Sequence, residues 1–179
     1  MQEGHELFTS LKYFLGFDEA DAANLARLAP IFAVPGPGVT DRFYAKLAEV
    51  PETAALIDGR VDALKRTHAR WMGELFAGDY GPAYFDNRWK IGLAHVRVNV
   101  PTQYVEAVVS FLRTETELLL SKAFASSREA EEHHVSLVKI LDLDLMIINL
   151  AYSAERIQRL SKFTGMSQKL LERCIQKGY

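Results

Sequence analysis

The feature that most limits how this chain folds is a long apolar stretch near its C-terminal end. Residues 135–152 are apolar nearly all round a helix, inside a helical pattern that runs from about residue 128 to 163. Such a stretch needs burial on two sides. Because Asp142, Asp144 and Asn149 interrupt it, a membrane span is a poor explanation. We therefore predict a helix packed between the protein core and a partner helix, as in a helix-bundle dimer.

The rest of the chain has the same helical spacing, and alternating strand-like runs are scarce. This pattern predicts an all-α fold. The breaks are the PGPG run at 35–38, Pro51, the turn at 78–82 and Pro101. Between them we expect helices over residues 7–14, 19–34, 39–50, 61–76, 84–95 and 102–124, with Asp18 as an N-cap. We divide the chain into a leading helix (1–17), a main domain (18–163) and a tail or linker (164–179).

Composition excludes several functional classes. The chain has 179 residues, 49% of them hydrophobic, which suffices for one buried core. A net charge of −2 without a basic stripe argues against nucleic acid as a partner. The single cysteine, Cys174, and the lack of an N-terminal signal or anchor pattern favour a reducing cytoplasm. No phosphate loop, serine nucleophile elbow or HExxH pair supports hydrolytic or nucleotide chemistry.

His95 is the first candidate ligand. It lies late in its helix, on a line with Tyr84, Arg88 and Ile91, and Gly92 on a neighbouring face permits close approach of another helix. An imidazole at a helix end, aimed across a bundle core, is the arrangement that binds haem iron from the proximal side in globins. The alternative is a histidine stabilised at a helix terminus by the helix dipole.

His68 is the second candidate. It stands at the centre of a helical stripe formed by Val61, Leu64, Trp71, Met72 and Leu75. One interpretation is a hydrogen-bonded core histidine. The other is that two inward-facing histidines, with an apolar pocket between them, hold one iron in a bis-histidyl, six-coordinate haem. A gas ligand would then have to displace His68.

Three further polar side chains are those of Tyr44, His133 and His134. The Tyr44 hydroxyl is either a donor to a gas ligand or to His68, or a core anchor between two helices. His133 and His134 follow several glutamates at the start of the last long helix, and we expect them on a solvated face.

Three segments resemble the globin-coupled sensors and protoglobins. YFDNRWKIGLAHVRV at 84–98, followed by Pro101 and Tyr104, resembles the proximal-helix signature of that family. LKRTHARW at 64–71 looks like its distal helix, and DRFY at 41–44 resembles the helix that bears its distal tyrosine. The resemblance covers roughly residues 14–163 and includes the short leading helix that this class adds to the globin fold.

The resemblance implies roles for individual residues. His95 takes the proximal-ligand position, Tyr44 the distal-tyrosine position, and His68 a distal-helix position that is usually apolar, a departure that strengthens the bis-histidyl interpretation. The residues that we expect to contact haem b are His95, His68, Tyr44, Phe43, Leu64, Trp71, Met72, Ile91, Val98, Tyr104 and Val108. The haem propionates have four plausible cationic partners, namely Lys65, Arg66, Lys90 and Arg97.

The resemblance also implies a function. Sensors of this family form homodimers through their last two long helices and pass a signal to a C-terminal kinase, cyclase or chemoreceptor module. We expect a non-enzymatic sensor of a diatomic gas (oxygen, nitric oxide or carbon monoxide) or of redox state. No output module is recognisable in this sequence, so its partner is either a separate protein or a missing module.

Two other classes stay open. One is a protoglobin-like haem enzyme that oxidises nitric oxide or acts as a peroxidase, although an enzyme benefits from an open iron site. The other is a haem-free globin-like interaction module in which His68 and His95 are core residues.

Overall fold

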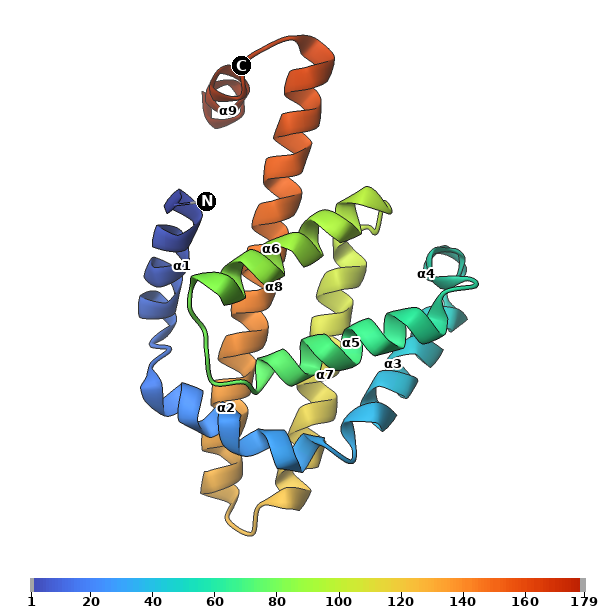
Figure 1. The fold of residues 1–179 in the computed structure, drawn as a ribbon, viewed down its shortest axis with the longest axis vertical. Helices are drawn as coiled ribbons and strands as arrows, with labels where there is room; N and C mark the ends of the chain where they lie inside the picture. Colours follow the sequence, from blue (N-terminus) through green and yellow to red (C-terminus); the bar gives the residue numbers. More distant parts are fainter. Residues whose placement is uncertain (1, 178–179) are drawn as a thin grey trace.

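The computed structural model describes residues 2–177 as helices joined by short connections, without a strand in that range (Figure 1). Residues 1 and 178–179, which belong to the predicted leading helix and tail, lie outside the described part. The all-α prediction is confirmed. The helices are α1 (Gln2–Leu15), α2 (Glu19–Phe32), α3 (Gly36–Glu49), α4 (Pro51–Ile57), α5 (Val61–Leu75), α6 (Pro82–Arg97), α7 (Thr102–Ala123), α8 (Ser127–Thr164) and α9 (Gln168–Lys177).

Local capping explains several of these boundaries. The Asp18 carboxylate accepts hydrogen bonds from the backbone N–H groups of Ala20 and Asp21 at 2.9 and 3.1 Å, and the Asp21 side chain accepts one from the Asp18 N–H at 3.1 Å. This reciprocal capping box fixes the start of α2. Helix α8 begins after Ser126, whose hydroxyl accepts from Glu129 N–H, and ends at Gly165, whose φ of 75° is left-handed.

Three segments differ from the expected boundaries. The PGPG run was expected to interrupt the chain, yet α3 begins at Gly36 and only residues 33–35 separate it from α2. Pro35 is the N-cap and Pro37 lies in the first turn, where the missing proline N–H costs no hydrogen bond. For the same reason α4 begins directly at Pro51. The segment predicted as a tail or linker contains a helix, α9, that contacts α8.

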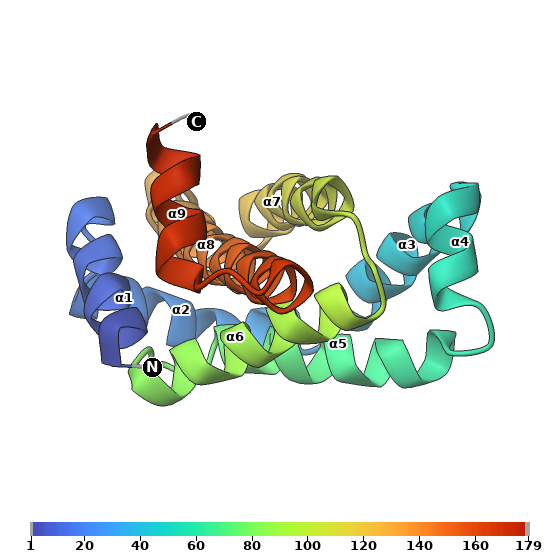
Figure 2. The ribbon, with the colours of Figure 1, turned by 90° about the horizontal axis from the view of Figure 1, so that it is seen from above.

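Helix α8 is the axis of the fold. It runs along the long direction of the molecule, and α6, α7 and α2 pack on it most extensively (Figure 1). Seen from above, α1 lies at one side of α8, and α3 and α4 lie at the other (Figure 2). Helix α5 packs mainly on α3. Helices of its own chain therefore cover most of the apolar stretch of α8, although Val135 is 47% exposed.

The close approach expected at Gly92 is confirmed. A Cβ atom at this position would lie 2.7 Å from Ala151 Cβ and 3.0 Å from the backbone oxygen of Ile148. Any side chain there would force α6 away from α8. Gly92 thus sets how closely the helix that carries His95 can pack on the central helix.

The expected solvent exposure of His133 is wrong. Its side chain is buried, it stacks on Phe124 with ring centroids 4.4 Å apart, and its Nδ1 lies 2.9 Å from the backbone oxygen of Glu129. The glutamates on the preceding turn suggested a solvated face, but the turn between α7 and α8 folds Phe124 over the imidazole. His134 is half-buried.

None of the described helices is long and apolar enough to cross a membrane. Polar side chains within α8 account for this. Asp142 and Asp144 lie in its most apolar part, and both are ion-paired, Asp142 with Arg113 of α7 and Asp144 with Arg88 of α6.

Candidate functional site

His95 lies in the last turn of α6 and is half-buried. Its Nδ1 atom is fully buried and forms no hydrogen bond within residues 2–177. Burial lowers the pKa of the imidazole, because a charged ring loses more hydration than a neutral one. The ring is therefore held neutral, and a neutral imidazole is the form that binds metal ions.

His68 lies in the middle of α5 and faces α3. Its Nδ1 is 2.9 Å from Oγ1 of Thr40, whereas its Nε2 is fully buried and has no hydrogen-bond partner in the described chain. Burial lowers the pKa of His68 to about 4, so this ring is neutral at pH 7. Each of the two candidate histidines thus carries a buried nitrogen atom without a partner.

Aromatic rings surround His68. The ring centroids of Phe43 and Trp71 both lie 5.1 Å from that of His68, and Tyr44 meets it edge-on at 6.2 Å with an interplanar angle of 88°. Burial raises the pKa of Tyr44 to about 12, so its hydroxyl keeps its proton and is a donor at neutral pH. The imidazole therefore has an aromatic setting, with the hydroxyl-bearing side chains of Thr40 and Tyr44 beside it.

Two apolar clusters separate from the main core adjoin the two histidine-bearing helices. The distal cluster, next to α5, comprises Phe43, Tyr44 and Ile57 with Leu47, Val61, Leu64, Val108 and Phe111 packed around them. The proximal cluster, next to α6, comprises Val96, Val105, Ile148 and Tyr152 with Ile91, Val100 and Leu145. The clusters share no residue. Five of the predicted haem contacts therefore belong to these two clusters, namely Phe43, Tyr44, Leu64, Ile91 and Val108.

Three other predicted contacts have different surroundings. Met72 is buried in the main core. Val98, at the end of α6, is 37% exposed. The Tyr104 hydroxyl at the start of α7 donates a hydrogen bond to the Glu52 carboxylate of α4, which raises the pKa of Tyr104. The structure does not bring these side chains into either cluster.

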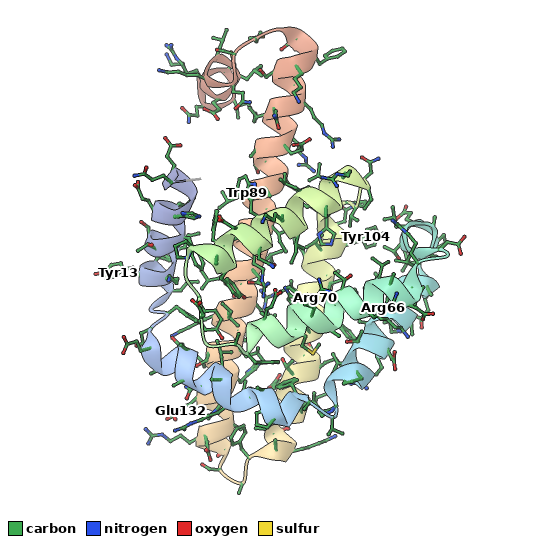
Figure 3. The ribbon with its side chains drawn as sticks, viewed as in Figure 1. Tyr13, Arg66, Arg70, Trp89, Tyr104 and Glu132 are labelled. Atoms are coloured by element: carbon green, nitrogen blue, oxygen red, sulfur yellow. The ribbon has the colours of Figure 1, made fainter. Side chains whose placement is uncertain are left out.

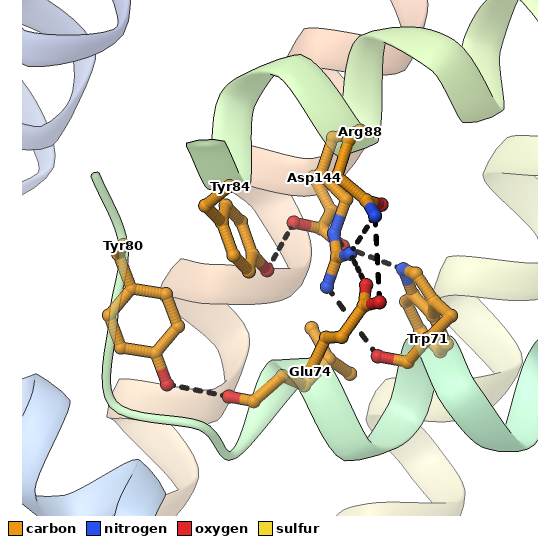
Figure 4. Close-up of polar contacts among 8 residues, drawn as sticks. Trp71, Glu74, Tyr80, Tyr84, Arg88 and Asp144 are labelled. Carbon is orange, nitrogen blue, oxygen red and sulfur yellow. Dashed lines mark hydrogen bonds and ion pairs between the residues drawn. The ribbon is translucent and has the colours of Figure 1, made fainter. Parts of the chain in front are cut away.

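A buried polar network beside the site was missed by sequence reasoning (Figure 4). The Asp144 carboxylate of α8 accepts hydrogen bonds from Trp71 Nε1 at 2.8 Å, Tyr84 hydroxyl at 2.5 Å and Arg88 Nε at 2.8 Å. Arg88 is completely buried and also pairs with Glu74 of α5. The network therefore joins α5, α6 and α8 through one carboxylate.

Opposing effects act on the Asp144 carboxyl group. Burial raises its pKa, while the Arg88 guanidinium and the hydrogen bonds from Tyr84 and Trp71 act in the other direction. A signal for this network was present in the sequence: a charged residue inside an apolar run needs a buried partner.

The candidate propionate partners lie on the surface side of α5 and α6. Lys65 is already paired with Asp41, with Nζ 2.6 Å from Oδ1. Arg66, Lys90 and Arg97 are exposed, and Figure 3 shows Arg66 beside the exposed Arg70 along α5. The structure does not single out one of the four predicted cations.

The residues present fit a haem group. Neutral imidazole nitrogens without partners are suitable axial donors, and apolar walls are what a macrocycle of this kind requires. The helical arrangement around α6, α7 and α8, with these two histidines on α5 and α6, defines the molecule as a globin.

Comparison with known proteins identifies the family. The Protoglobin family model matches residues 4–170, and the chain belongs to the protoglobin family. Among solved structures, it is similar to the globin domain of the Geobacter sulfurreducens globin-coupled sensor, with a TM-score of 0.77 and 34% sequence identity over 80% of this chain and 96% of that one. The predicted globin fold and the predicted family are thus confirmed, and the family is one of haem-binding globins.

Proposed function

We propose that this chain is the sensor of a diatomic gas, or of haem redox state, with one haem b held by His95 and His68. The observation that carries the proposal is that His68 and His95 each have a buried nitrogen atom without a partner and lie on the two helices next to the distal and proximal apolar clusters. Haem, when bound, supplies an iron centre that takes up diatomic gases and changes oxidation state. The similarity to the domain of a globin-coupled sensor supports a sensing role.

In this proposal each residue has a defined part. His95 is the proximal ligand, and its position is held by the tight packing of α6 on α8 at Gly92. His68 would be the second residue that holds the iron, and it would have to leave that position before a gas could bind there. Tyr44, which keeps its proton and lies beside His68, would be a hydrogen-bond donor there.

Trp71 connects the candidate site to the central helix, through which the signal would pass. This residue is one turn from His68 on α5, its ring contacts the imidazole, and its indole N–H is bonded to Asp144 on α8. A displacement of His68 would therefore move Trp71 and, through its hydrogen bond to Asp144, would act on the central helix α8. We propose that α7 and α8 pair with a second copy of the chain and that a shift of α8 changes that pairing.

Absorption spectra of the haem-loaded full chain test the proposal. We expect the wild type to have a low-spin, six-coordinate ferric spectrum. Both His68→Ala and His95→Ala should lose this spectrum. Only His95→Ala should also retain haem poorly. The matched control is His134→Ala, a half-buried histidine of α8. A protein without a Soret band after reconstitution contradicts haem binding and leaves the interaction-module class. A high-spin wild type that His68→Ala leaves unchanged contradicts coordination by His68.

We propose sensing rather than catalysis, in the cytoplasm, with the signal going to a C-terminal or separate module. An imidazole that occupies the distal position competes with a substrate for the iron, which disfavours turnover. Sustained peroxidase or nitric oxide oxidation in the presence of added reductant, at rates that depend on protein concentration, would overturn this assignment in favour of the enzyme class.

A further inference from the structure

Thr40 of α3 contacts His68 through its hydroxyl group. It is buried, with 4% of its surface exposed, and its hydroxyl oxygen makes two short contacts. Oγ1 lies 3.2 Å from the backbone oxygen of Gly36, one helical turn earlier, and 2.9 Å from Nδ1 of His68. The hydroxyl therefore stands between a helix carbonyl and an imidazole nitrogen.

The positions of the protons follow from these two contacts. A hydroxyl has one proton, and a threonine inside a helix donates it to the carbonyl four residues earlier. Gly36 has only acceptor capacity there, so the Thr40 proton goes to Gly36. The oxygen then presents a lone pair to His68, and Nδ1 must carry the hydrogen that it accepts. A neutral imidazole has one N–H, so Nε2 keeps a free lone pair.

We propose that Thr40 is a positioning residue that holds His68 in the tautomer protonated on Nδ1 and thereby makes Nε2 an iron ligand. This inference rests on the proposed coordination by His68. In the opposite tautomer Nε2 would carry hydrogen, and His68 would be a hydrogen-bond donor to a gas ligand and no ligand of iron. One hydroxyl thus selects between two roles for the same histidine.

The packing around His68 also fixes the direction in which its Nε2 atom points. The rings of Phe43 and Trp71 both pack on the imidazole, at interplanar angles of 37° and 38°. A ring in such a packed setting exchanges its nitrogen positions only when its neighbours move. With Nδ1 bonded to Thr40, Nε2 is directed away from α3 and stays buried without a partner.

The test compares Thr40→Val, which has the same shape without the hydroxyl, with Thr40→Ser, which keeps it. Thr116→Val is the matched control, because Thr116 is equally buried and its hydroxyl donates to the carbonyl of Leu112 four residues earlier, without contact to a histidine. Nitrogen-15 NMR of the full chain before haem is added reports the His68 tautomer. The ferric absorption spectrum of the haem-loaded protein reports its coordination.

We expect the wild type, Thr40→Ser and Thr116→Val to show the tautomer protonated on Nδ1. Thr40→Val should show a mixture, and its coordination by His68 should weaken by roughly 10–100-fold, as when other groups that orient a metal-bound histidine are removed. A Thr40→Val protein with an unchanged tautomer and an unchanged low-spin fraction overturns the inference. A high-spin wild type would instead refute coordination by His68, while the NMR comparison would still decide what Thr40 does.

Discussion

The indole N–H of Trp71 on α5 donates a hydrogen bond to Oδ2 of Asp144 on α8, across 2.8 Å. Asp144 is buried to 1% exposure and also binds Tyr84 and Arg88 of α6. Since Trp71 contacts the ring of His68, this bond connects the distal histidine to the central helix. Both histidine-bearing helices are thereby tied to the same carboxylate.

Removing that carboxylate should strongly destabilise the protein. In Asp144→Ala the Arg88 guanidinium, which is completely buried, loses a partner, and breaking such a buried pair typically costs about 3–5 kcal/mol. Equilibrium unfolding in urea measures the change. Asp142→Asn is the matched control on the same helix, because the ion pair of Asp142 with Arg113 is partly exposed and should contribute at most about 1 kcal/mol. Equal losses in both variants would contradict a structural role of the network.

A methyl group at Gly92 should separate α6 from α8. We expect Gly92→Ala to lose about 1–3 kcal/mol of unfolding free energy, since its Cβ would lie 2.7 Å from that of Ala151. Gly73 of α5 is the control, because a Cβ there meets nothing within 4 Å. Gly73→Ala should instead stabilise the protein by about 0.5–1 kcal/mol. Thermal and urea unfolding of the two variants should therefore shift in opposite directions.

Replacing His68 by leucine should open the distal side. If His68 occupies the iron, gas binding requires its prior departure, and the apparent affinity is reduced by the small fraction of protein in which it has left. His68→Leu should therefore bind carbon monoxide faster and roughly tenfold or more tightly in the ferrous state, a gain of about 1.4 kcal/mol or more. Flash photolysis and equilibrium titration measure this. Unchanged ferrous spectra and unchanged affinity rule out displacement of His68.

A charge on the outer face of α7 should disrupt the proposed dimer. Leu118 of α7 and Val135 of α8 are 54% and 47% exposed. Exposed apolar side chains are typical of an interface with another protein surface. We expect Leu118→Glu to convert a dimer to a monomer in sedimentation velocity. Tyr13→Glu, at an 89% exposed position on α1, should leave the dimer intact. A wild type that is monomeric at all concentrations contradicts the proposed pairing.

Stability should fall in alkali because of Tyr80. Its hydroxyl donates to the backbone oxygen of Leu75 at 2.6 Å, and burial raises its pKa from 10.0 to about 12. The folded state therefore holds the phenolic proton more tightly than the unfolded state does, and the associated stability is complete below pH 10 and is lost as pH rises from 10 to 12. Urea unfolding across this range should show a shallower decline for Tyr80→Phe than for the wild type. Parallel declines would contradict the assignment.

Local patterns in the sequence were sufficient for most of the helices and for the prediction that His68 faces inward. Capping by Asp18 acts within a few residues, so it can be recognised without tertiary information. The PGPG run and Pro51 also act locally, but they were expected to break the chain, and in the structure α3 and α4 begin there. The apolar stripe of α5 placed His68 inward because side chains three and four residues apart share a helix face. The helix α4 was missed because it has only seven residues. The helix α9 was missed although it is amphipathic, because ten residues of mixed polarity after Gly165 are also typical of a tail or linker.

The partners of the buried polar groups were decided only by the tertiary structure. Thr40 and His68 are 28 positions apart, and Trp71 and Asp144 are 73 apart. The sequence by itself determined that a carboxylate in an apolar run and a histidine in an apolar stripe would need partners, because burying an unpaired polar group is costly. Which groups meet depends on how closely helices pack, as at Gly92, and on where turns fold back, as over His133. These distances arise from the assembly of all helices at once, and no local pattern encodes them.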